Sequence, residues 1–218
     1  MNSTPTEFWE QRYADSERVW SGRVNPVLAD VAAGLVPGRS LDLGCCEGGD
    51  VVWLARNGWQ ATGVDLSATA VSRARQSAQE RGLAERTTFV AADLAAWTPD
   101  DEYDLVSASF LQSWPVPIPR EQILRRATGF VAPGGVLLVV GHASPPPWSR
   151  HDHAGHGDHP GQTCPDPATD LSALALDEAH WDVQVCEVRE RQATGPEGTS
   201  AVLHDSVVLV SRRSADHT

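Results

Sequence analysis

A glycine turn and a later carboxylate have the types and spacing to hold a nucleotide. Gly44 and Gly48 follow the short apolar run 40–43, and Asp65 ends the next apolar run, 61–64. Gly44 can adopt backbone conformations that are closed to residues with a side chain, so the chain can approach a ligand closely there. A carboxylate about 20 positions after the first glycine can accept hydrogen bonds from both hydroxyls of a ribose.

The elements that position these residues follow from the same stretch. Residues 40–43 suit a short buried strand, and residues 50–57 carry apolar side chains at helical spacing. A helix that begins after the glycines presents free N–H groups at its N-terminus. Strand, glycine turn, helix, strand and acid in this order predict a nucleotide-binding βαβ unit. A tight turn that binds nothing is the alternative, and it leaves Asp65 unexplained.

The glycine loop differs from the dinucleotide fingerprint G-x-G-x-x-G, because it reads Gly-Cys-Cys-Glu-Gly at 44–48. It resembles motif I of the class I S-adenosylmethionine (SAM) methyltransferases, an acid-x-Gly-x-Gly-x-Gly loop in which Cys46 here replaces the middle glycine. The resemblance implies SAM as the cofactor and S-adenosylhomocysteine (SAH) as its product. It also implies a set of cofactor contacts, which are Asp42, Gly44, Cys45, Cys46, Gly48, Asp65, Leu66, Asp93 and Leu94.

Asp93 and Leu94 resemble the family's next motif, in which an acid at the end of the third strand meets the amino group of adenine. An exocyclic amine needs a hydrogen-bond acceptor, and a carboxylate is the strongest acceptor among the side chains. Capping of a helix or turn is the alternative role for Asp93.

The run 104–111 predicts a fourth strand and its exit, where the family's cofactor methyl group meets the acceptor. Family members that methylate amide or base nitrogens carry Asn-Pro-Pro-aromatic at this point, whereas this chain has Ser-Ala-Ser-Phe at 107–110. The departure argues against methylation of DNA adenine or of glutamine. The catalytic candidates are His142, Ser109 and Phe110, and Ser109 is also a candidate cofactor contact. The expected acceptor pocket consists of Phe110, Leu111, Gln112, Trp114, His142 and Trp148.

Residues 1–36 predict an N-terminal helical cap. In the methyltransferases that this chain resembles, such a segment closes over the cofactor, which implies cofactor contacts from Tyr13 and Trp20. For Phe8 and Trp9 we favour simple packing on the edge of the sheet. For Tyr13, Trp20 and also His142, packing is an equally good alternative.

The whole chain predicts one α/β domain over residues 1–218. We expect a Rossmann-like, seven-stranded, mostly parallel sheet with helices on both faces and an antiparallel C-terminal hairpin. Beyond the first two strands, the sequence predicts strands at 87–92, 104–111, 136–140, 181–193 and 201–211. It predicts helices at 6–17 with Thr6 as the cap, 26–34, 67–81, 120–132 and 168–177. Residues 142–167 are rich in proline, glycine and histidine and predict a lid loop.

The composition excludes several classes of protein. The net charge is −12 and all 17 basic residues are arginine, which argues against tight nonspecific nucleic-acid binding. No apolar run approaches the roughly 20 residues that a membrane span needs. The N-terminus lacks the features of a secretory signal, so a cytoplasmic location is expected. The four cysteines form no disulfide framework. The oligomeric state is left open.

Methyl transfer from a sulfonium is a direct displacement, which demands alignment and exclusion of water. A neutral hydroxyl or a protonated amine needs a base, whereas an anionic soft acceptor needs none. The sequence shows no obvious acid–base pair near the expected reaction centre, which favours a small thiol, selenium or tellurium compound or another activated acceptor. The chain looks most like the small bacterial methyltransferases of the tellurite-resistance and thiopurine type.

A second hypothesis comes from the histidines and aspartates in the loop 151–159. Imidazole and carboxylate at this density can bind zinc or nickel, so the chain could be a metal-binding or sequestering protein on a methyltransferase-like scaffold without catalysis. The spacings match no helical pair or standard zinc finger. We therefore expect a solvated loop without a stoichiometric metal.

Overall fold

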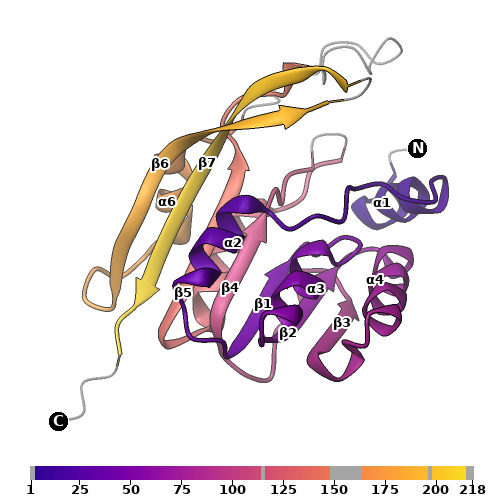
Figure 1. Cartoon of the computed structure of the whole chain (residues 1–218). Coiled ribbons are helices and arrows are strands. Elements are labelled where there is room, and N and C mark those ends of the chain that lie inside the picture. Colours follow the sequence, from indigo (N-terminus) through magenta and orange to yellow (C-terminus); the bar gives the residue numbers. More distant parts are fainter. Residues whose placement is uncertain (1–2, 114–115, 148–163, 196–197, 215–218) are drawn as a thin grey trace.

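The computed structural model describes residues 3–113, 116–147, 164–195 and 198–214. Its centre is a seven-stranded sheet in the order β3-β2-β1-β4-β5-β7-β6 (Figure 1). The first five strands are parallel, and β7 lies antiparallel between β5 and β6. The strands are β1 (Arg39–Leu43), β2 (Gln60–Asp65), β3 (Thr87–Ala91), β4 (Tyr103–Ser109), β5 (Val131–His142), β6 (Trp181–Thr194) and β7 (Ser200–Arg212).

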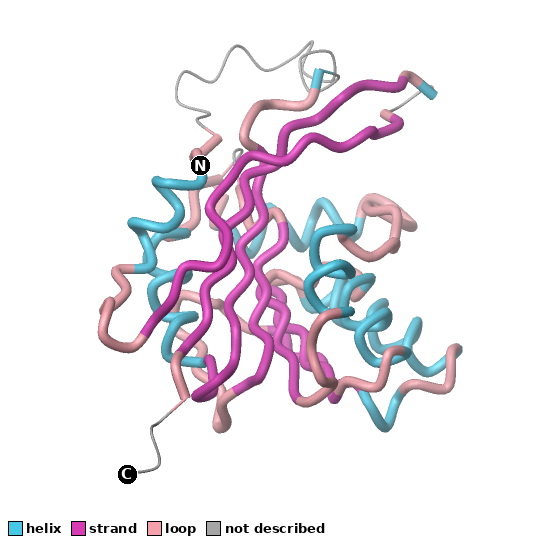
Figure 2. The backbone as a smooth tube through the Cα atoms, turned by 60° about the vertical axis from the view of Figure 1, so that its left-hand side comes forward, coloured by secondary structure: helices cyan, strands magenta, loops and turns pink. Residues whose placement is uncertain are grey.

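Helices cover both faces of the sheet, as the side view shows (Figure 2). They are α1 (Pro5–Ala14), α2 (Pro26–Ala33), α3 (Gly49–Arg56), α4 (Ala68–Glu80), α5 (Arg120–Ala127) and α6 (Pro167–Leu174), with 3-10 turns at Ala84–Arg86 and Thr128–Phe130. One core cluster joins α2, α3 and α4 to one face of the sheet, and a second joins α5 and α6 to the other. Because both faces are buried, the central strands are continuous apolar runs rather than alternating ones. The predicted fold class is confirmed.

The chain order of the strands creates the crevice that the site occupies. From β1 the chain moves outward to β2 and β3, and then returns to the other side of β1 as β4. Ligands in open α/β sheets bind at such a switch point, outside the carboxyl ends of the strands. Asp42 on β1 pairs in register with Ser107 on β4, so the two strands end side by side at this crevice.

Several predicted boundaries were wrong for identifiable reasons. The first helix begins after Thr4, whose side chain forms a reciprocal capping box with Glu7, and not after Thr6. The helix predicted at 120–132 ends at Ala127 and continues only as a 3-10 turn. The fifth strand already begins at Val131, because a shift in register against β4 absorbs the Pro-Gly-Gly segment that we expected to be a turn.

Some predictions fall outside the described residues. Trp114 and Trp148 lie there, as does the histidine-rich loop 151–159, and the proposed lid is described only at its two ends.

The terminal hairpin extends beyond the rest of the sheet (Figures 1 and 2). Pairing of β5 with β7 ends at His142 and Asp205, whereas pairing of β6 with β7 continues to Thr194 and Ser200. The hairpin therefore carries side chains past the carboxyl end of β5, on the side where the crevice opens.

A buried ion pair joins α5 to α6 beside this crevice. Both guanidinium nitrogens of Arg120 bind the carboxylate of Asp170, whose side chain is 1% exposed. The Nε of Arg120 also donates to the carbonyl of Leu111, at 2.8 Å, in the segment that leaves β4. One arginine thus connects α6, α5 and the exit of β4.

Replacing one partner of this ion pair should destabilise the protein more than replacing both. Arg120→Met leaves a buried carboxylate unpaired and should lower the free energy of unfolding by about 3–5 kcal/mol. Arg120→Met combined with Asp170→Leu should recover most of that loss, as measured by urea unfolding. The exposed pair Arg39–Asp101 is the matched control, and each of its single replacements should cost about 1 kcal/mol or less. Strictly additive losses for the buried pair would contradict this account.

Candidate functional site

A cavity of about 310 Å³ lies at the carboxyl ends of the central strands. Residues from α1, the glycine loop, the ends of β2 and β3, the exit of β4 and the start of α5 line it. They are Thr4, Pro5, Thr6, Trp9, Tyr13, Trp20, Gly44, Cys46, Asp65, Leu66, Asp93, Leu94, Phe110, Leu111, Gln112, Ser113, Ile118, Pro119 and Ile123. The wall is mostly aromatic and aliphatic, and two carboxylates stand at one end of it.

Asp65 holds the glycine loop in place from the end of β2. Its carboxylate accepts hydrogen bonds from the backbone N–H groups of Cys46 and Ser67, each at 2.9 Å. The carbonyl of Val64, one residue earlier, accepts from the N–H groups of Gly44 and Cys45. Asp65 is 7% exposed, and burial raises the pKa of its carboxyl above the ordinary value. The carboxylate is therefore both a structural anchor and a wall of the cavity.

The glycine loop has left-handed backbone at three positions. Gly44 and Gly48 each have φ +79°, and Cys46 has φ +51°. A Cβ added to Gly44 would stand 2.8 Å from the Leu111 side chain, so any residue larger than glycine would collide with Leu111. Left-handed backbone at Cys46 explains why the related motif carries glycine at this position. Here a cysteine tolerates that conformation at some cost in strain.

Asp93 follows β3 and combines both of the roles considered for it. Its Oδ1 accepts from the N–H of Ala95 at 2.9 Å, which is a turn cap, and the residue also lines the cavity beside Leu94. At this corner Leu66 and Leu94 supply apolar side chains next to the two carboxylates, Asp65 and Asp93.

The N-terminal helix forms one wall of the cavity. Tyr13 is 2% exposed, and its hydroxyl accepts a hydrogen bond from Nε1 of Trp20 at 2.9 Å. Burial, and then the neighbouring Cys46, raise the pKa of the Tyr13 hydroxyl, so this group stays protonated. Trp9 also lines the cavity, and its Nε1 donates to the hydroxyl of Ser113 at 3.1 Å. We expected Trp9 only to pack on the edge of the sheet, and the structure places it in the cavity wall as well. Trp9 and Tyr13 are four residues apart, and this helical spacing puts both on one face of α1.

Two glutamates fasten this N-terminal segment to the body. The Glu10 carboxylate accepts from the hydroxyl of Ser67 at 2.7 Å and from the hydroxyl and N–H of Thr69, at the start of α4. Glu47 in the glycine loop pairs with Arg73 at 3.0 Å and accepts from the backbone N–H groups of residues 19 and 20. Access to the glycine loop from this side is therefore controlled by residues 5–20.

The exit of β4 forms the opposite wall. Phe110 has φ +52°, and its ring stacks on His142 with centroids 4.4 Å apart. The backbone N–H of His142 donates to Oε1 of Gln112 at 3.1 Å. The Nδ1 of His142 lies 3.7 Å from the carboxylate of Asp205 on β7. His142 thus stands behind Phe110, which faces the cavity.

The structure brings together most of the predicted site residues that it describes, but not all of them. Asp42 and Cys45 are buried beneath the loop, and Gly48 packs against α4 and β3. Ser109 lies near the carboxylate of Asp50 rather than in the cavity wall, and His142 is separated from the cavity by Phe110.

Sequence reasoning missed the remaining wall residues. They are Thr4, Pro5, Thr6, Trp9, Ser113, Ile118, Pro119 and Ile123. Apart from the helical spacing of Trp9, no motif marked them, because they come from the start of α1 and the segment before α5, which meet only in the folded chain.

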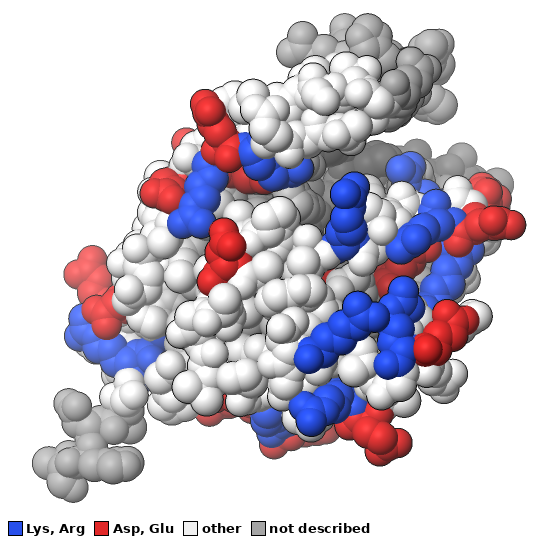
Figure 3. Space-filling model, viewed as in Figure 1, with Lys and Arg blue, Asp and Glu red and all other residues white. Residues whose placement is uncertain are grey.

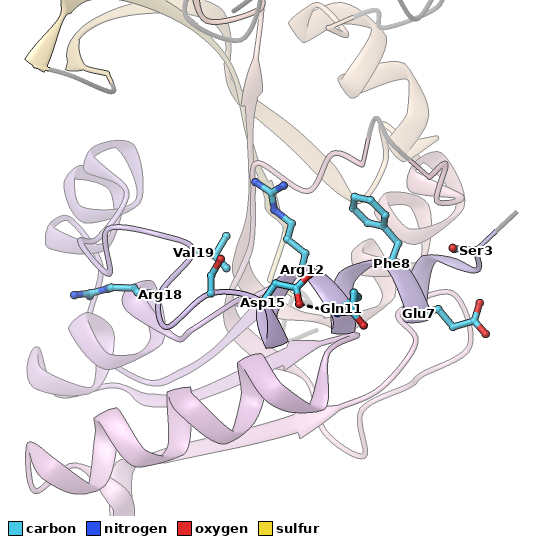
Figure 4. Close-up of a pocket in the computed structure, with 9 residues that line it drawn as sticks. Ser3, Glu7, Phe8, Gln11, Arg12, Asp15, Arg18 and Val19 are labelled. Carbon is cyan, nitrogen blue, oxygen red and sulfur yellow. Dashed lines mark hydrogen bonds between the residues drawn. The ribbon is translucent and has the colours of Figure 1, made fainter. Parts of the chain in front are cut away.

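A wider depression of about 530 Å³ lies on the outer side of α1 (Figure 4). It is lined by polar and charged side chains such as Glu7, Gln11, Arg12 and Asp15. It does not share wall residues with the inner cavity, although Arg12 in its wall also stands against the rings of Trp9 and Trp20, which line the inner cavity. We regard the inner cavity as the site.

Within the described ranges, no cluster of three or more histidine, cysteine or carboxylate side chains has the geometry to hold a metal ion. No helix of the described residues is long and apolar enough to cross a membrane.

Comparisons with known proteins agree with this geometry. Residues 41–135 match the family model described as "Methyltransferase domain". The chain is 26% identical to a solved structure described as "Conversion of a Disulfide Bond into a Thioacetal Group during Echinomycin Biosynthesis", with a TM-score of 0.71, covering 95% of this chain and 93% of that one. Residues 41–135 thus have the sequence of a methyltransferase domain, and the fold matches that solved structure over nearly its whole length.

Two curated proteins that are similar to this chain are informative. "Probable thiol methyltransferase 2" of Arabidopsis thaliana is 30% identical over 64% of this chain and 63% of its own length. The 2-heptyl-1-hydroxyquinolin-4(1H)-one methyltransferase of Mycobacteroides abscessus is 34% identical over 59% of this chain and 58% of its own length. The alignments thus span about six tenths of these two relatives.

Two carboxyl groups of this chain, Asp42 and Asp50, repel each other beneath the glycine loop. Asp42 is 3% exposed and accepts from the hydroxyl of Ser107 at 2.9 Å. Burial, and then the neighbouring Asp50, raise the pKa of the Asp42 carboxyl well above its ordinary value. Asp50 accepts from the backbone N–H of Asn25 at 2.7 Å, and burial raises its pKa as well.

Asp42→Asn should stabilise the ligand-free protein at neutral pH. An acid whose pKa is raised on folding binds its proton more tightly in the folded state. The free energy of unfolding therefore falls as the pH rises from the unfolded pKa of about 4 through the higher folded pKa. The variant does not lose stability in this way. Its free energy of unfolding should therefore exceed that of the wild type by an amount that grows above about pH 4 and vanishes below it. Urea midpoints from pH 3 to 8 would measure this difference.

Asp100→Asn, at an exposed position, is the control for a simple change of net charge. The difference in free energy of unfolding between Asp100→Asn and the wild type should not grow with pH. If Asp42→Asn changed the free energy of unfolding equally at every pH, folding would not raise the pKa of Asp42.

Proposed function

We propose that this protein transfers the methyl group of SAM to a small-molecule acceptor, with a thiol or another soft, already nucleophilic group as the acceptor. The observation that carries the proposal is the cavity itself. It joins the carboxylates at the ends of β2 and β3 to the aromatic wall at the exit of β4. A cofactor that fills the acidic end would direct its methyl group towards that wall.

The acidic end suits the nucleoside part of SAM. Asp65 would accept from the ribose hydroxyls, and Asp93 from the adenine amine, with Leu66 and Leu94 packing on the adenine ring. The loop from Gly44 to Gly48 would pass close to the rest of the cofactor. The rings of Tyr13, Trp20 and Phe110 would contribute cation–π attraction for the sulfonium, worth about 0.5–2 kcal/mol.

The chemistry of the wall favours an acceptor that brings its own lone pair. A general base needs a pKa near the working pH. The Tyr13 hydroxyl and the Cys46 thiol in the wall both have their pKa raised by burial, so neither ionises easily. Asp65 already accepts two backbone hydrogen bonds. His142 lies behind the Phe110 ring, and we propose that it fixes the orientation of that ring. Thiolates and similar anions need no such base.

The relatives support this acceptor class without deciding it. The Arabidopsis relative is described as acting on thiols, and the solved structure concerns conversion of a disulfide bond. The Mycobacteroides relative acts on a quinolone, which keeps an activated hydroxyl or ring nitrogen open as the alternative acceptor.

A macromolecular substrate suits the molecule less well. The net charge is −12, and on the face seen in Figure 3 the basic side chains that gather on the right-hand half have acidic ones beside them. Binding of nucleic acid relies on neutralising phosphates with basic side chains, which a net negative charge opposes. Nor is the non-catalytic metal-binding hypothesis favoured, because the family and the intact acidic corner both point to cofactor use.

The proposed cofactor site is tested by Asp65→Ala. The variant loses the acceptor for the ribose hydroxyls and the anchor of the glycine loop, and it should bind SAH more weakly by about 1–3 kcal/mol. Isothermal titration calorimetry measures this directly, with Asp101→Ala, at the exposed opposite end of the sheet, as the control. Unchanged SAH affinity in Asp65→Ala would remove Asp65 from the site.

The proposed acceptor class is tested by a substrate screen. Small thiols, chalcogen oxyanions, phenols and amines would be compared with DNA, tRNA and protein, and SAH formation would be measured by chromatography. We expect turnover with small soft nucleophiles, and Phe110→Ala should reduce it far more than it reduces SAH affinity. Methyl transfer confined to the macromolecules would refute the proposal.

A further inference from the structure

The charges around the cavity are distributed unequally. The described residues that line it include two carboxylates, Asp65 and Asp93, at the cofactor end, and no arginine or histidine. Asp42 and Asp50 lie beneath the loop, where burial raises the pKa of both carboxyl groups. This end attracts a cationic ligand. Aromatic rings form much of the remaining wall, from Trp20 beside the glycine loop to Trp9 and Phe110. Two guanidinium groups stand against these rings.

Arg12 is the first of these cations. Its guanidinium carbon lies 5.8 Å from the ring of Trp9 and 6.0 Å from the ring of Trp20, and both rings line the cavity. Its neighbours on α1 have other partners, because Glu7 caps the helix with Thr4 and the Asp15 carboxylate accepts from Gln11. No carboxylate of the described chain lies within ion-pair distance of Arg12.

Arg191 is the second cation, and it differs from Arg12 in its partners. It lies 5.6 Å from the ring of Phe110, on the opposite wall of the cavity. Its Nε binds the carboxylate of Asp205, which is 2% exposed, so its charge is compensated within the hairpin. Of the two guanidinium groups that stand against the cavity's rings, Arg12 is therefore the one without an ion-pair partner among the described residues. In Figure 4 its side chain extends from α1 on the same side as Phe8, whereas Glu7 points away.

We infer that the methyl acceptor reaches the cavity as an anion and that Arg12 is the residue that selects it. The inference rests on the proposed methyl transfer. It goes beyond it by assigning a negative charge to the substrate and by naming the residue that favours binding of that charge. A cationic cofactor at the acidic end and an anionic acceptor at the arginine end would each meet opposite charge. Potentials of this kind raise the rate of productive encounter and discriminate between ligands of different charge.

The chemical step is consistent with an anionic acceptor. The lone pair of a thiolate sulfur forms a bond to the methyl carbon, while the bond from that carbon to the sulfonium breaks and its electron pair stays on the sulfur of SAH. An anion and a cation thus give a neutral thioether and neutral sulfide sulfur, with no proton to transfer. Arg12 takes no part in bond making and acts on acceptor binding.

Three thiols that differ only in charge test this inference. Mercaptopropionate, its alcohol analogue and its amine analogue would be compared as acceptors, with SAH formation as the readout. Wild-type kcat/KM should decrease in that order. Arg12→Gln should reduce the preference for mercaptopropionate over the alcohol roughly tenfold, through KM rather than kcat. Arg12→Lys should retain most of the preference, and raised salt should weaken it in the wild type.

Arg56→Gln is the matched control, because it removes the same charge from an exposed position at the far end of α3. It should leave the preference unchanged. If wild type methylates the thiols without regard to their charge, or if Arg12→Gln and Arg56→Gln behave alike, the inference is overturned while the proposed methyl transfer stands.

Fluorescence quenching tests the role of Arg12 separately from the acceptor class, because it needs no turnover. If none of the thiols is methylated, the proposed acceptor class fails, and iodide quenching of tryptophan fluorescence still tests Arg12. Iodide should quench the wild type more than Arg12→Gln, whereas neutral acrylamide should quench both equally, since Trp9 and Trp20 lie beside the guanidinium. Equal iodide quenching of the two proteins would overturn the role of Arg12.

Discussion

The carboxylate of Asp65 is the constraint on which the site depends. It is buried at the end of β2, and its two oxygens accept hydrogen bonds from the N–H groups of Cys46 and Ser67. The glycine loop and the start of α4 are thereby held at one distance from the sheet. Backbone N–H groups that lack a partner in a buried position cost free energy, so this carboxylate could not be removed without rearranging the loop.

The same corner brings three carboxyl groups close together, those of Asp42, Asp50 and Asp65. Burial raises the pKa of Asp42, Asp50 and Asp65, which means that each opposes its own ionisation. Functional sites commonly carry such perturbed groups, because the ligand supplies the missing charge. A cation with a sulfonium and an ammonium group would relieve the repulsion, whereas a neutral nucleoside would not.

The N-terminal segment converts this corner into an enclosed cavity. Glu10 and Glu47 attach it to α4 and the glycine loop, while Trp9 attaches it to the segment after β4 through Ser113. Cofactor wall and acceptor wall therefore share one helix, α1. Exclusion of water from a displacement at a sulfonium needs such a cover, and the aromatic side chains provide it without adding a nucleophile that could compete with the acceptor.

The amino-acid sequence by itself determined the local features. The strand–glycine–helix–strand order, the acid at position 65 and the hairpin at the C-terminus follow from periodicity, glycine placement and turn chemistry over short distances, and the structure contains all of them. Element ends were less certain, because caps such as Thr4 compete with nearby alternatives of similar energy.

Only the tertiary structure decided which side chains face the cavity. Ser109 and Phe110 are adjacent in sequence, yet the left-handed backbone at Phe110 directs the two residues to different surroundings. Trp9 and Ser113, or Arg12 and Trp20, meet through long-range packing that no local pattern encodes. Sequence spacing determines which face of an element a residue occupies, but the neighbour that this face meets depends on how the whole sheet and its covering helices assemble.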